Sequence, residues 1–259
     1  MNEKKLNIAE LAKQVDDAAL NASSIEQLSL KNKFDLAQAY SIKEASIARR
    51  LGRGESLIGI KMGFTSQAKM IQMGVDDMIW GRLTNTMLLE EGGQLDLGNF
   101  IHPRIEPEIA FVLKKPLVGE VTAAQALSAV EAIVPAMEVI DSRYQNFKFS
   151  LEDVVADNSS SAGVVMGNWH SPKTDIDNLG MVLEFNGKPV QIGSSAAILG
   201  RPIRSLVAAA RLAGEANLEL QEGWIIMAGA ATAAQAITPN THIATRVEKL
   251  GALSIKSNG

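Results

Sequence analysis

The sequence predicts an α+β fold in which a small helical segment precedes a mixed, largely antiparallel β-sheet. Residues 8–52 carry the apolar spacing of helices, whereas most later segments have the composition of strands. Several connections are also too short for the crossover helices that a purely parallel sheet needs. There is no internal repeat or long flexible linker. We therefore expect a helical N-terminal segment at 1–54 and a mixed β domain at 55–259.

The helical segment ends in an amphipathic pattern. Leu36, Tyr40, Ile47 and Leu51 lie near one face of a predicted helix, and Gly52 marks its end. The next expected elements are a strand at 56–64, a short helix at 66–74 between Ser66 and Gly74, a strand at 105–113, a helix at 122–133 that opens with the capping-box pair Thr122 and Gln125, and a strand at 134–142.

The second half of the chain continues this mixture of strands and helices. The expected elements are a short helix at 150–158, a strand at 162–167, a hairpin at 181–192, a helix at 201–217 and strands at 223–232 and 242–255. Asn186 and Gly187 form the dipeptide that tight hairpins prefer. Pro202 lies in the first turn of its helix, where proline is tolerated.

The composition limits the possible functions. Of 259 residues, 46% are hydrophobic and 21% are charged, as in ordinary soluble proteins. The formal net charge of 25 − 29 = −4 gives no reason to expect nucleic-acid binding. The absence of Cys excludes disulfides, zinc–thiolate centres and thiol nucleophiles. No stretch reads as a signal peptide or a membrane span, so we expect a cytoplasmic protein without membrane contact.

Two acidic residues precede an apolar run in "RIEPEIAFVL". On a strand, Glu106 and Glu108 point to one face, with Ile105 and Ile109 on the other. Adjacent carboxylates repel each other, and a divalent cation would relieve that repulsion. A solvated strand face is the alternative. Pro107 lacks a ladder donor, so we expect a strand edge or a strand end at this position.

A magnesium site would need a third acidic ligand. The segment "AMEVIDSR" offers Glu138 and Asp141, which face opposite sides of a regular strand, and their spacing does not decide between them. His102 shares the strand parity of the acidic pair, but Pro103 interrupts the pattern, and we assign His102 a structural or supporting role. Because the chain has only three His, any metal site must be mostly oxygen-liganded, which favours Mg²⁺ or Mn²⁺.

Two further segments contain candidate substrate contacts. Lys61 lies in the apolar segment "GIKMGF" and is either an edge residue that reaches water or a functional cation. The segment "DNSSSAG" places three hydroxyls between a predicted helix and a strand. They could hold a carboxylate or make ordinary loop hydrogen bonds. No Gly precedes these serines, so they do not form the nucleophile elbow of esterases.

Four segments resemble the fumarylacetoacetase-like superfamily. They are "GIKMGFTSQAKMIQMGVDDMIWGRLTNTM", "HPRIEPEIAFVL", "PAMEVIDSRY" and "DNSSSAGVVMG", and they occur in the expected order. The resemblance is to the branch of 2-hydroxypentadienoate hydratases and 4-oxalocrotonate decarboxylases, which act in the meta-cleavage pathways of aromatic degradation. The segments "IKMGF" and "DDMIWG" look like the decarboxylases of this branch rather than its hydratases.

This resemblance implies a fold and a site. The fold is a mixed β-sheet roll of the fumarylacetoacetase C-terminal-like type. The implied Mg²⁺ or Mn²⁺ ligands are Glu106, Glu108 and Glu138. The implied substrate contacts are Lys61 and the best-matching serine, Ser160, near the substrate carboxylate.

Three more residues enter the hypothesis with less support from the motifs. Asp141 follows Glu138 in the same motif and is kept as a candidate catalytic residue. Trp80 and Met73 are candidates for an apolar wall of the site, with core packing as the alternative.

The implied reaction is the metal-dependent decarboxylation of 2-oxo-hex-3-enedioate to 2-hydroxypenta-2,4-dienoate and CO₂. Conjugation carries the released electrons to the C2 oxygen, where a metal would stabilise them, so no organic cofactor is needed. The resemblance also implies a homo-oligomer and a complex with the vinylpyruvate hydratase of the same pathway.

Three other functions are weighed against this one. The first is a 2-hydroxypenta-2,4-dienoate hydratase on the same scaffold. The second is a C–C hydrolase of acylpyruvates, for which we find no convincing His–Glu pair in the N-terminal third. The third is a non-catalytic partner subunit of the hydratase, and the intact pair of Glu106 and Glu108 argues against it.

Overall fold

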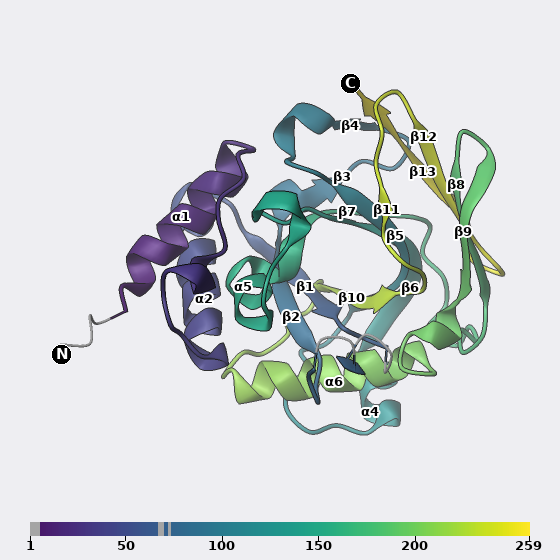
Figure 1. Cartoon of the computed structure of the whole chain (residues 1–259). Helices are drawn as coiled ribbons and strands as arrows, with labels where there is room; N and C mark the ends of the chain where they lie inside the picture. The colour runs from purple at the N-terminus through teal and green to yellow at the C-terminus, as the bar shows by residue number, and fades with distance from the viewer. Residues whose placement is uncertain (1–5, 67–69, 72–73) are drawn as a thin grey trace.

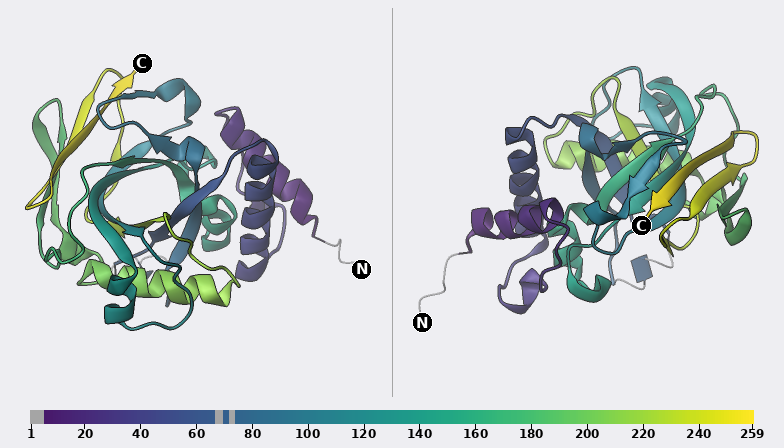
Figure 2. Two further views of the ribbon diagram at one scale, coloured as in Figure 1. Left: turned by 180° about the vertical axis from the view of Figure 1, so that it is seen from behind. Right: turned by 90° about the horizontal axis from the view of Figure 1, so that it is seen from above.

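The larger of two β-sheets forms the centre of the molecule, with the N-terminal helices on one side and the smaller sheet, which contains the C-terminal strands, on the other (Figures 1 and 2). The structure is a computed structural model and describes residues 6–66, 70–71 and 74–259. Most of the helix expected at 66–74 therefore lies outside the described residues. Among the described helices, none is both long and apolar enough to cross a membrane.

The N-terminal helices form where the sequence predicts them. Helix α1 (Ile8–Leu20) begins after the cap residue Asn7, and α2 (Leu36–Gly52) begins with a capping box of Asp35 and Gln38. Helix α2 ends at Gly52, as expected. Its buried face is different from the predicted one, since Leu36 and Leu51 are 39% and 36% exposed.

The buried face of α2 is shifted because the helix packs between α1 and α5 (Leu151–Ala156). The residues that this packing buries are Ala39, Ile42, Lys43, Ser46 and Ile47. Only Ile47 belongs to the set that periodicity predicts. The apolar pattern of one helix does not show where neighbouring helices will lie. Here the positions of α1 and α5 decide which face of α2 is buried.

The larger sheet has eight strands and is mixed. Its order is β2-β1-β10-β5-β6-β7-β3, with β11 paired to β5. The pairs β1–β10 and β3–β7 are parallel, and the other strand pairs of this sheet are antiparallel. The strands are β1 (Leu57–Gly63), β2 (Ile79–Thr84), β3 (Leu88–Leu89), β5 (Arg104–Leu113), β6 (Val130–Ile140), β7 (Ser161–Met166), β10 (Ile225–Ala230) and β11 (Gln235–Ala236).

The smaller sheet has five strands in the order β4-β13-β12-β8-β9. Its strands are β4 (Gln94–Asp96), β8 (Gly180–Phe185), β9 (Lys188–Ser194), β12 (His242–Val247) and β13 (Gly251–Asn258). The predicted hairpin at β8–β9 is confirmed, and its turn residues Asn186 and Gly187 both have positive φ, 51° and 74°. The α+β class with a mixed, largely antiparallel sheet is therefore confirmed.

One predicted helix is shorter than expected. The capping box of Thr122 and Gln125 is present, but α4 covers only Ala123–Ser128. Residues 130–133 instead begin strand β6, where Val130 pairs with Leu113 and Ile133 with Phe111. Pairing along the whole length of β5 satisfies their backbone groups and buries their apolar side chains, and this outweighs their helical spacing.

The remaining helices cover the sheets. Helix α6 (Pro202–Glu215) starts with Pro202, as predicted, and packs on β10 and α4. Short 3₁₀ turns lie at Leu28–Leu30, Asn85–Met87, Leu97–Asn99, Gln145–Phe147, Asn158–Ser160 and Ser195–Ala197. The sequence pattern gave no signal for β2, β3 or β4.

The apolar interior crosses the predicted boundary near residue 54. One cluster joins Leu11 and Ile42 of the N-terminal helices to Ile79, Tyr144 and Val154 of the later chain. The division into segments 1–54 and 55–259 therefore stays a prediction about folding units.

Candidate active site

Strands β5 and β6 bring three carboxylates together. Glu106 and Glu138 face each other directly in the antiparallel pair, and Glu108 lies two residues further along β5. One carboxylate oxygen from each of the three lies within 4.8 Å of the others. The three acids that the resemblance assigns to the metal thus form one cluster. Their role as ligands stays a prediction, because the geometry alone shows only that they meet.

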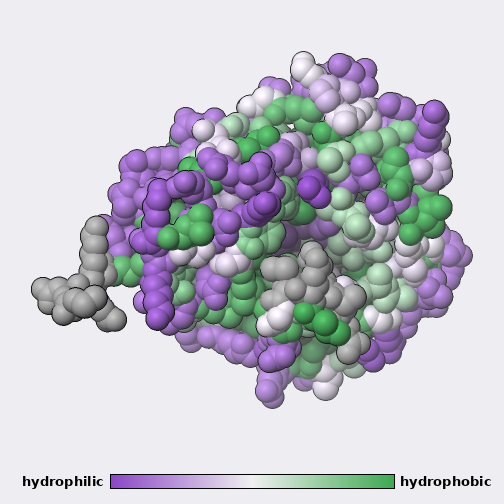
Figure 3. Space-filling model, viewed as in Figure 1, coloured by the Kyte–Doolittle hydropathy of each residue, from purple (hydrophilic) through white to green (hydrophobic). Residues whose placement is uncertain are grey.

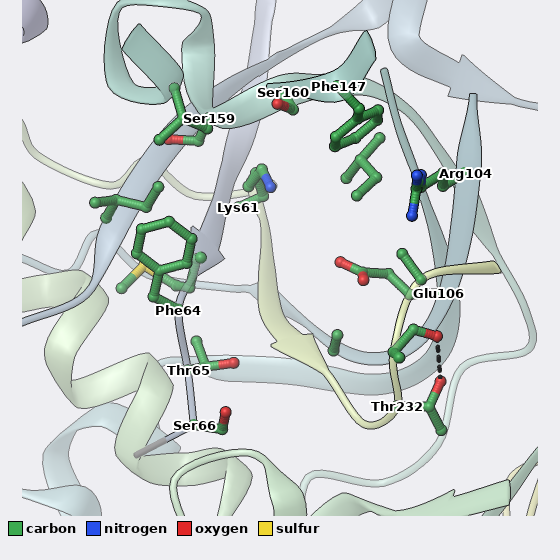
Figure 4. Close-up of a pocket in the computed structure, with 18 of the residues that line it drawn as sticks. Lys61, Phe64, Thr65, Ser66, Arg104, Glu106, Phe147, Ser159, Ser160 and Thr232 are labelled. Carbon is green, nitrogen blue, oxygen red and sulfur yellow. Dashed lines mark hydrogen bonds between the residues drawn. The ribbon is translucent and has the colours of Figure 1, made fainter. Parts of the chain in front are cut away.

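Burial makes this cluster unfavourable without a cation. Glu108 is fully buried and Glu138 is 1% exposed, whereas Glu106 is partly exposed and faces a cavity (Figure 4). Burial and then the neighbouring Glu138 and Glu106 raise the pKa of Glu108 well above its usual range. Its Oε1 atom has no hydrogen-bond partner in the described part of the chain. The donor set of carboxylate oxygens with one orphaned atom fits a hard divalent ion.

Lys61 neutralises part of this charge. Its ammonium lies 3.0 Å from Oε1 and 3.1 Å from Oε2 of Glu138, and the side chain is 4% exposed. Burial raises the pKa of Glu138, while Lys61 lowers it. Lys61 is therefore not an edge residue that reaches water, and its role as a functional cation stays a prediction.

Glycine at position 59 serves strand pairing rather than a ligand. Strand β1 runs parallel to β10, with Gly59 opposite Ile225. A Cβ at position 59 would lie 1.9 Å from the Ile225 carbonyl oxygen. The absence of a side chain thus lets β1 approach β10 and places Lys61 beside the carboxylates.

The structure corrects the expectation for Pro107. Strand β5 is not an edge, since β6 pairs with it on one side and β10 and β11 on the other. The ladder between β5 and β10 is irregular between Met227 and Ala230, and Pro107 accepts a hydrogen bond from Ala231 on this side. A proline is tolerated inside the sheet because its missing donor falls at this irregularity.

Gly229 supports Glu108 within the same irregularity. Its N–H donates a hydrogen bond of 2.8 Å to Oε2 of Glu108. Its φ of +107° is a conformation that side chains rarely adopt, and a Cβ there would lie 2.0 Å from Oγ1 of Thr65. This glycine holds one oxygen of Glu108 and leaves the other directed at the cluster.

A cavity of about 640 Å³ opens beside the carboxylates. Figure 3 shows that this face of the molecule is hollowed near its middle. Polar and charged groups in its lining include Lys61, Thr65, Ser66, Arg104, Glu106, Asn146, Ser159, Ser160 and Thr232, and the apolar lining includes Met62, Phe64, Ile79, Ile140, Phe147, Phe149 and Val154. The space is large enough for a small dicarboxylate, because ligand pockets begin near ~300 Å³.

Ser160 lies on this cavity, as the resemblance implies, and Ser159 lies there with it (Figure 4). Both side chains are 3% exposed, and neither hydroxyl has a hydrogen-bond partner among the described residues. Asn158, Ser159 and Ser160 have positive φ values of 50°, 52° and 58°. Such backbone strain at consecutive residues clusters at functional sites, and here it directs two hydroxyls toward the cavity.

The turn at Asn158–Ser160, called the serine turn here, is held by contacts to Arg82 and Arg143. The Asn158 side chain accepts a hydrogen bond of 2.7 Å from the Arg82 N–H and donates one of 2.9 Å to the Arg82 carbonyl. Buried Arg143 forms an ion pair with Asp157 at the start of the turn. These contacts stabilise a backbone that would otherwise relax.

Asp141 is not brought to the cluster. Its two carboxylate oxygens accept hydrogen bonds from the N–H groups of Ile101 and His102, at 2.8 and 2.9 Å. It is 4% exposed and absent from the cavity lining. We therefore assign Asp141 to holding the turn that leads into β5 rather than to substrate contact. His102 packs on Phe147 next to this turn, with ring centroids 5.1 Å apart.

The proposed apolar wall consists of other residues. Trp80 lies in the core, stacked on Tyr40 at 5.6 Å, and does not line the cavity. Met73 lies outside the described residues. The apolar side chains that do line the cavity include Phe64, Phe147 and Phe149, which the sequence reasoning did not identify.

Arg104 was also missed as a functional candidate. It lines the cavity, and its guanidinium carbon lies 4.5 Å from the centre of the Phe147 ring. A usable signal was present, since Arg104 shares the strand parity of Glu106 and Glu108. Phe147 carried no such signal, because it lies in a turn whose geometry only the structure shows. Ser159 belongs to the candidate segment "DNSSSAG", but the sequence does not show which of its hydroxyls face the cavity.

The model of one protein family matches most of the chain. Residues 65–256 match the fumarylacetoacetate (FAA) hydrolase C-terminal family. A 4-oxalocrotonate decarboxylase of Pseudomonas sp. is 53% identical over 254 residues, which is 98% of this chain and 99% of that protein. A 2-hydroxypent-2,4-dienoate hydratase of Pseudomonas putida is 38% identical over 205 residues, covering 77% of this chain and 92% of the hydratase.

A solved structure is similar along the whole chain. It is the 4-oxalocrotonate decarboxylase of Pseudomonas putida G7 complexed with magnesium and adipate, with a TM-score of 0.94 and 37% identity. The similarity covers 98% of this chain and 100% of that structure. The Pseudomonas sp. decarboxylase is thus more similar in sequence than the hydratase, and both decarboxylases match a larger share of this chain than the hydratase does.

Proposed function

Since the chain belongs to the fumarylacetoacetate hydrolase C-terminal family, we propose that it is a metal-dependent carboxy-lyase acting on 4-oxalocrotonate (2-oxo-hex-3-enedioate). The products are 2-hydroxypenta-2,4-dienoate and CO₂. The observation that carries this proposal is a cluster of three carboxylates beside Lys61 and a cavity, in a chain that matches decarboxylases over nearly its full length. The reaction belongs to the meta-cleavage degradation of aromatic compounds.

Glu106, Glu108 and Glu138 hold Mg²⁺, or Mn²⁺ in its place. Two observations support this assignment: their oxygens converge, and the buried Oε1 of Glu108 lacks a partner among the described residues. Magnesium also accompanies adipate in the similar solved decarboxylase. When bound, the ion supplies positive charge that stabilises negative charge developing on the 2-keto acid.

The substrate contains its own electron sink. When the C5–C6 bond breaks and CO₂ leaves, its electron pair forms the C4=C5 double bond. The C3=C4 pair then moves to C2–C3, and the C2 carbonyl pair moves onto its oxygen, which takes up one proton. No oxidant, reductant or organic cofactor is required.

Lys61 acts at the C2 oxygen of the substrate. Its ammonium is held by Glu138 at 3.0 Å and lies on the cavity wall (Figure 4). From this position it donates a hydrogen bond to the oxygen that becomes negative, and it can supply the proton that this oxygen takes up.

Ser160 positions the substrate dianion with its neighbour Ser159. Their hydroxyls are buried on the cavity and have no partner among the described residues, so a bound carboxylate would satisfy them. Phe64, Phe147 and Phe149 form apolar walls around the same space. An apolar environment favours a reaction in which a carboxylate leaves as neutral CO₂.

We also infer a cytoplasmic location from the sequence, while the family resemblance suggests self-association and a complex with the hydratase of the pathway. The proposed product matches the substrate in the name of the similar 2-hydroxypent-2,4-dienoate hydratase. Analytical ultracentrifugation of the purified protein, alone and with that hydratase, tests both associations.

The second candidate function is the hydratase reaction, which the 38% identity to a hydratase favours as an alternative. The two reactions are separated by incubating the Mg²⁺-loaded protein with each substrate. We expect one CO₂ per 2-oxo-hex-3-enedioate and no water addition to 2-hydroxypenta-2,4-dienoate. Hydration of the dienoate without CO₂ release from the diacid would overturn the proposal.

A variant links the reaction to the cluster. We expect Glu106→Gln to lower CO₂ release by at least roughly 100-fold at saturating Mg²⁺ and to leave the fold intact. Near-normal activity of the folded variant would remove Glu106 from the ligand set.

A further inference from the structure

Arg104 is a cation on the cavity wall that has no counter-ion among the described residues. It begins β5, lines the cavity and shares the strand face of Glu106. No hydrogen bond or ion pair joins its guanidinium to another described residue. Its contact is instead the Phe147 ring, 4.5 Å away. An arginine that lines a cavity without a carboxylate partner is a candidate for binding an anionic ligand.

Phe147, which contacts this guanidinium, has a strained backbone conformation. Asn146 and Phe147 have φ values of 59° and 56°, which is unusual for a bulky aromatic residue. The turn places the Phe147 ring beside Arg104. When a guanidinium lies over an aromatic ring, its N–H groups point outward in the plane of the guanidinium and remain available to a ligand. Asp141 fixes the chain just before Arg104 through the N–H groups of Ile101 and His102.

The movement of charge in the proposed reaction decides which end of the substrate suits this arginine. Negative charge leaves the C6 carboxylate and arrives at the C2 oxygen. A cation bound to the C6 carboxylate would lose its partner in the transition state and would raise the barrier. A cation at the C1 carboxylate keeps its partner throughout and also lies near the new charge.

The net charge of the cluster also favours placing Arg104 at the C1 carboxylate of the substrate. Three carboxylates carry −3, while Lys61 and a divalent ion carry +3, so the loaded cluster is neutral. The keto acid end then adds −1 and gains more charge during the reaction. Arg104 lies on the same face of β5 as Glu106 and supplies the additional positive charge at that end.

Resting on the proposed function, we propose that Arg104 binds the C1 carboxylate of the 2-keto acid and so fixes the orientation of the substrate. The distal carboxylate then lies toward Ser159 and Ser160. In Figure 4, Ser159 and Arg104 lie on opposite sides of Lys61. The distal end thus meets neutral hydroxyls and aromatic rings, from which CO₂ can depart without breaking an ion pair.

Two unreactive ligands that differ only at the distal end test this orientation. They are 2-oxoadipate, which has both carboxylates, and 2-oxohexanoate, which lacks the distal one. Neither has the C3=C4 double bond, so neither can be decarboxylated through the C2 oxygen. Calorimetry on the Mn²⁺-loaded protein gives the Kd of each ligand for the wild type, Arg104→Met and Arg104→Lys.

We expect Arg104→Met to weaken both ligands by a similar factor, about 10- to 100-fold, since a charge-assisted pair is lost. The ratio of the two Kd values should stay as in the wild type. Arg104→Lys should recover part of the loss, because it restores the charge without the planar fork. The control is Arg246→Met, since Arg246 is exposed and pairs with Glu184 away from the cavity.

Two results would overturn the proposal. If Arg104→Met weakens only 2-oxoadipate, Arg104 binds the distal carboxylate. If it weakens neither ligand while Mn²⁺ binding is intact, Arg104 contacts no substrate carboxylate. The assay needs no turnover, so it is independent of the reaction test. A wild-type protein that fails to release CO₂ would contradict the proposed function and leave this binding result readable.

Discussion

At the scale of single residues, the proposed function depends on carboxylates whose environment is unfavourable for the charge they hold. Glu108 is fully buried next to two other carboxylates, and one of its oxygens has no partner among the described residues. Lys61 balances the negative charge of Glu138, but this one cation cannot balance the charges of Glu106 and Glu108 as well. A bound divalent cation would therefore balance the charge of this cluster.

The raised pKa of Glu108 predicts how pH and metal act together on stability. Without metal, Glu108 is protonated to a larger extent in the folded protein than in the unfolded chain between about pH 4.3 and its raised pKa. The contribution of Glu108 to the free energy of unfolding should thus fall as pH rises through this window. Because Mg²⁺ replaces the proton, the increase in Tm on adding Mg²⁺ should be larger at pH 8 than at pH 5.5.

Thermal unfolding in EDTA and in excess Mg²⁺ at the two pH values measures this effect. Glu108→Gln is the matched control and should lose most of the dependence on both pH and Mg²⁺. An equal Mg²⁺ effect at both pH values in the wild type would contradict the assignment.

Lys61 should separate metal binding from turnover. Lys61→Met removes a positive charge beside Glu138, so the variant should bind Mn²⁺ at least as tightly as the wild type. It should release CO₂ about 10²- to 10⁴-fold more slowly, since a proton donor at the C2 oxygen is lost. Mn²⁺ titration followed by electron paramagnetic resonance, together with CO₂ release, checks both parts. Parallel loss of metal binding and activity would instead make Lys61 a support of the metal site.

At the scale of elements, the site depends on how β5 meets its neighbours. Strand β6 supplies Glu138 directly opposite Glu106, while β10 departs from regular pairing and lets the Gly229 N–H reach Glu108. The irregularity also accommodates Pro107 in the middle of the sheet. One local interruption therefore allows a proline, a buried carboxylate and a close approach to Thr65 to coexist.

Alanine substitutions at two glycines test whether the site depends on the irregular pairing of β5 and β10. Gly229→Ala should destabilise the fold by roughly 1–3 kcal/mol and weaken Mn²⁺ binding, because it strains the backbone and overlaps Thr65. Gly223→Ala is the matched control, with a φ of +79° but open space around its Cβ position. Urea unfolding and Mn²⁺ titration should show the smaller stability loss and normal metal binding for the control. Equal effects of the two substitutions would mean that positive φ alone explains the glycine at 229.

The sequence predicted elements whose signal is local and missed those defined by contact. The hairpin at 186–187 and the capping box at 122 and 125 follow from turn and cap chemistry. Residues 130–133 have a helical spacing but form a strand, because β5 offers a pairing partner along its whole length.

For the site, strand parity predicted that Glu106 and Glu108 share a face, whereas the choice of Glu138 depended on the resemblance to the family. The positions of Phe147 and Ser159 depend on left-handed turns that the sequence pattern does not reveal.

For the whole molecule, the N-terminal helices and the β-sheets share an interior. Their common cluster includes Ile42 from α2 and Val154 from α5, and α5 leads directly into the serine turn of the site. Buried Asp16 of α1 accepts hydrogen bonds from Arg49 and Arg53, all at 2.7 Å. These contacts fasten α1 to the end of α2 within segment 1–54, and the shared apolar cluster joins that segment to the later chain. We therefore expect the two predicted segments to unfold together.

Asp16→Asn tests this coupling. It keeps the shape of the side chain but removes the charge, which should lower the free energy of unfolding by about 1–3 kcal/mol. Differential scanning calorimetry should show one transition at a lower Tm, with Mn²⁺ affinity unchanged because Asp16 is outside the site. Two separate transitions, with only the first shifted, would show that 1–54 unfolds independently.

The central claim is that one divalent ion joins three acidic side chains and receives a 2-keto acid. Crystals grown with Mn²⁺ and 2-oxoadipate test it through the anomalous signal of the metal. We expect one peak bound by Glu106, Glu108 and Glu138, with the keto acid end of the ligand at the ion. A peak that lies elsewhere, or a cluster that stays without metal at saturating Mn²⁺, would contradict the claim.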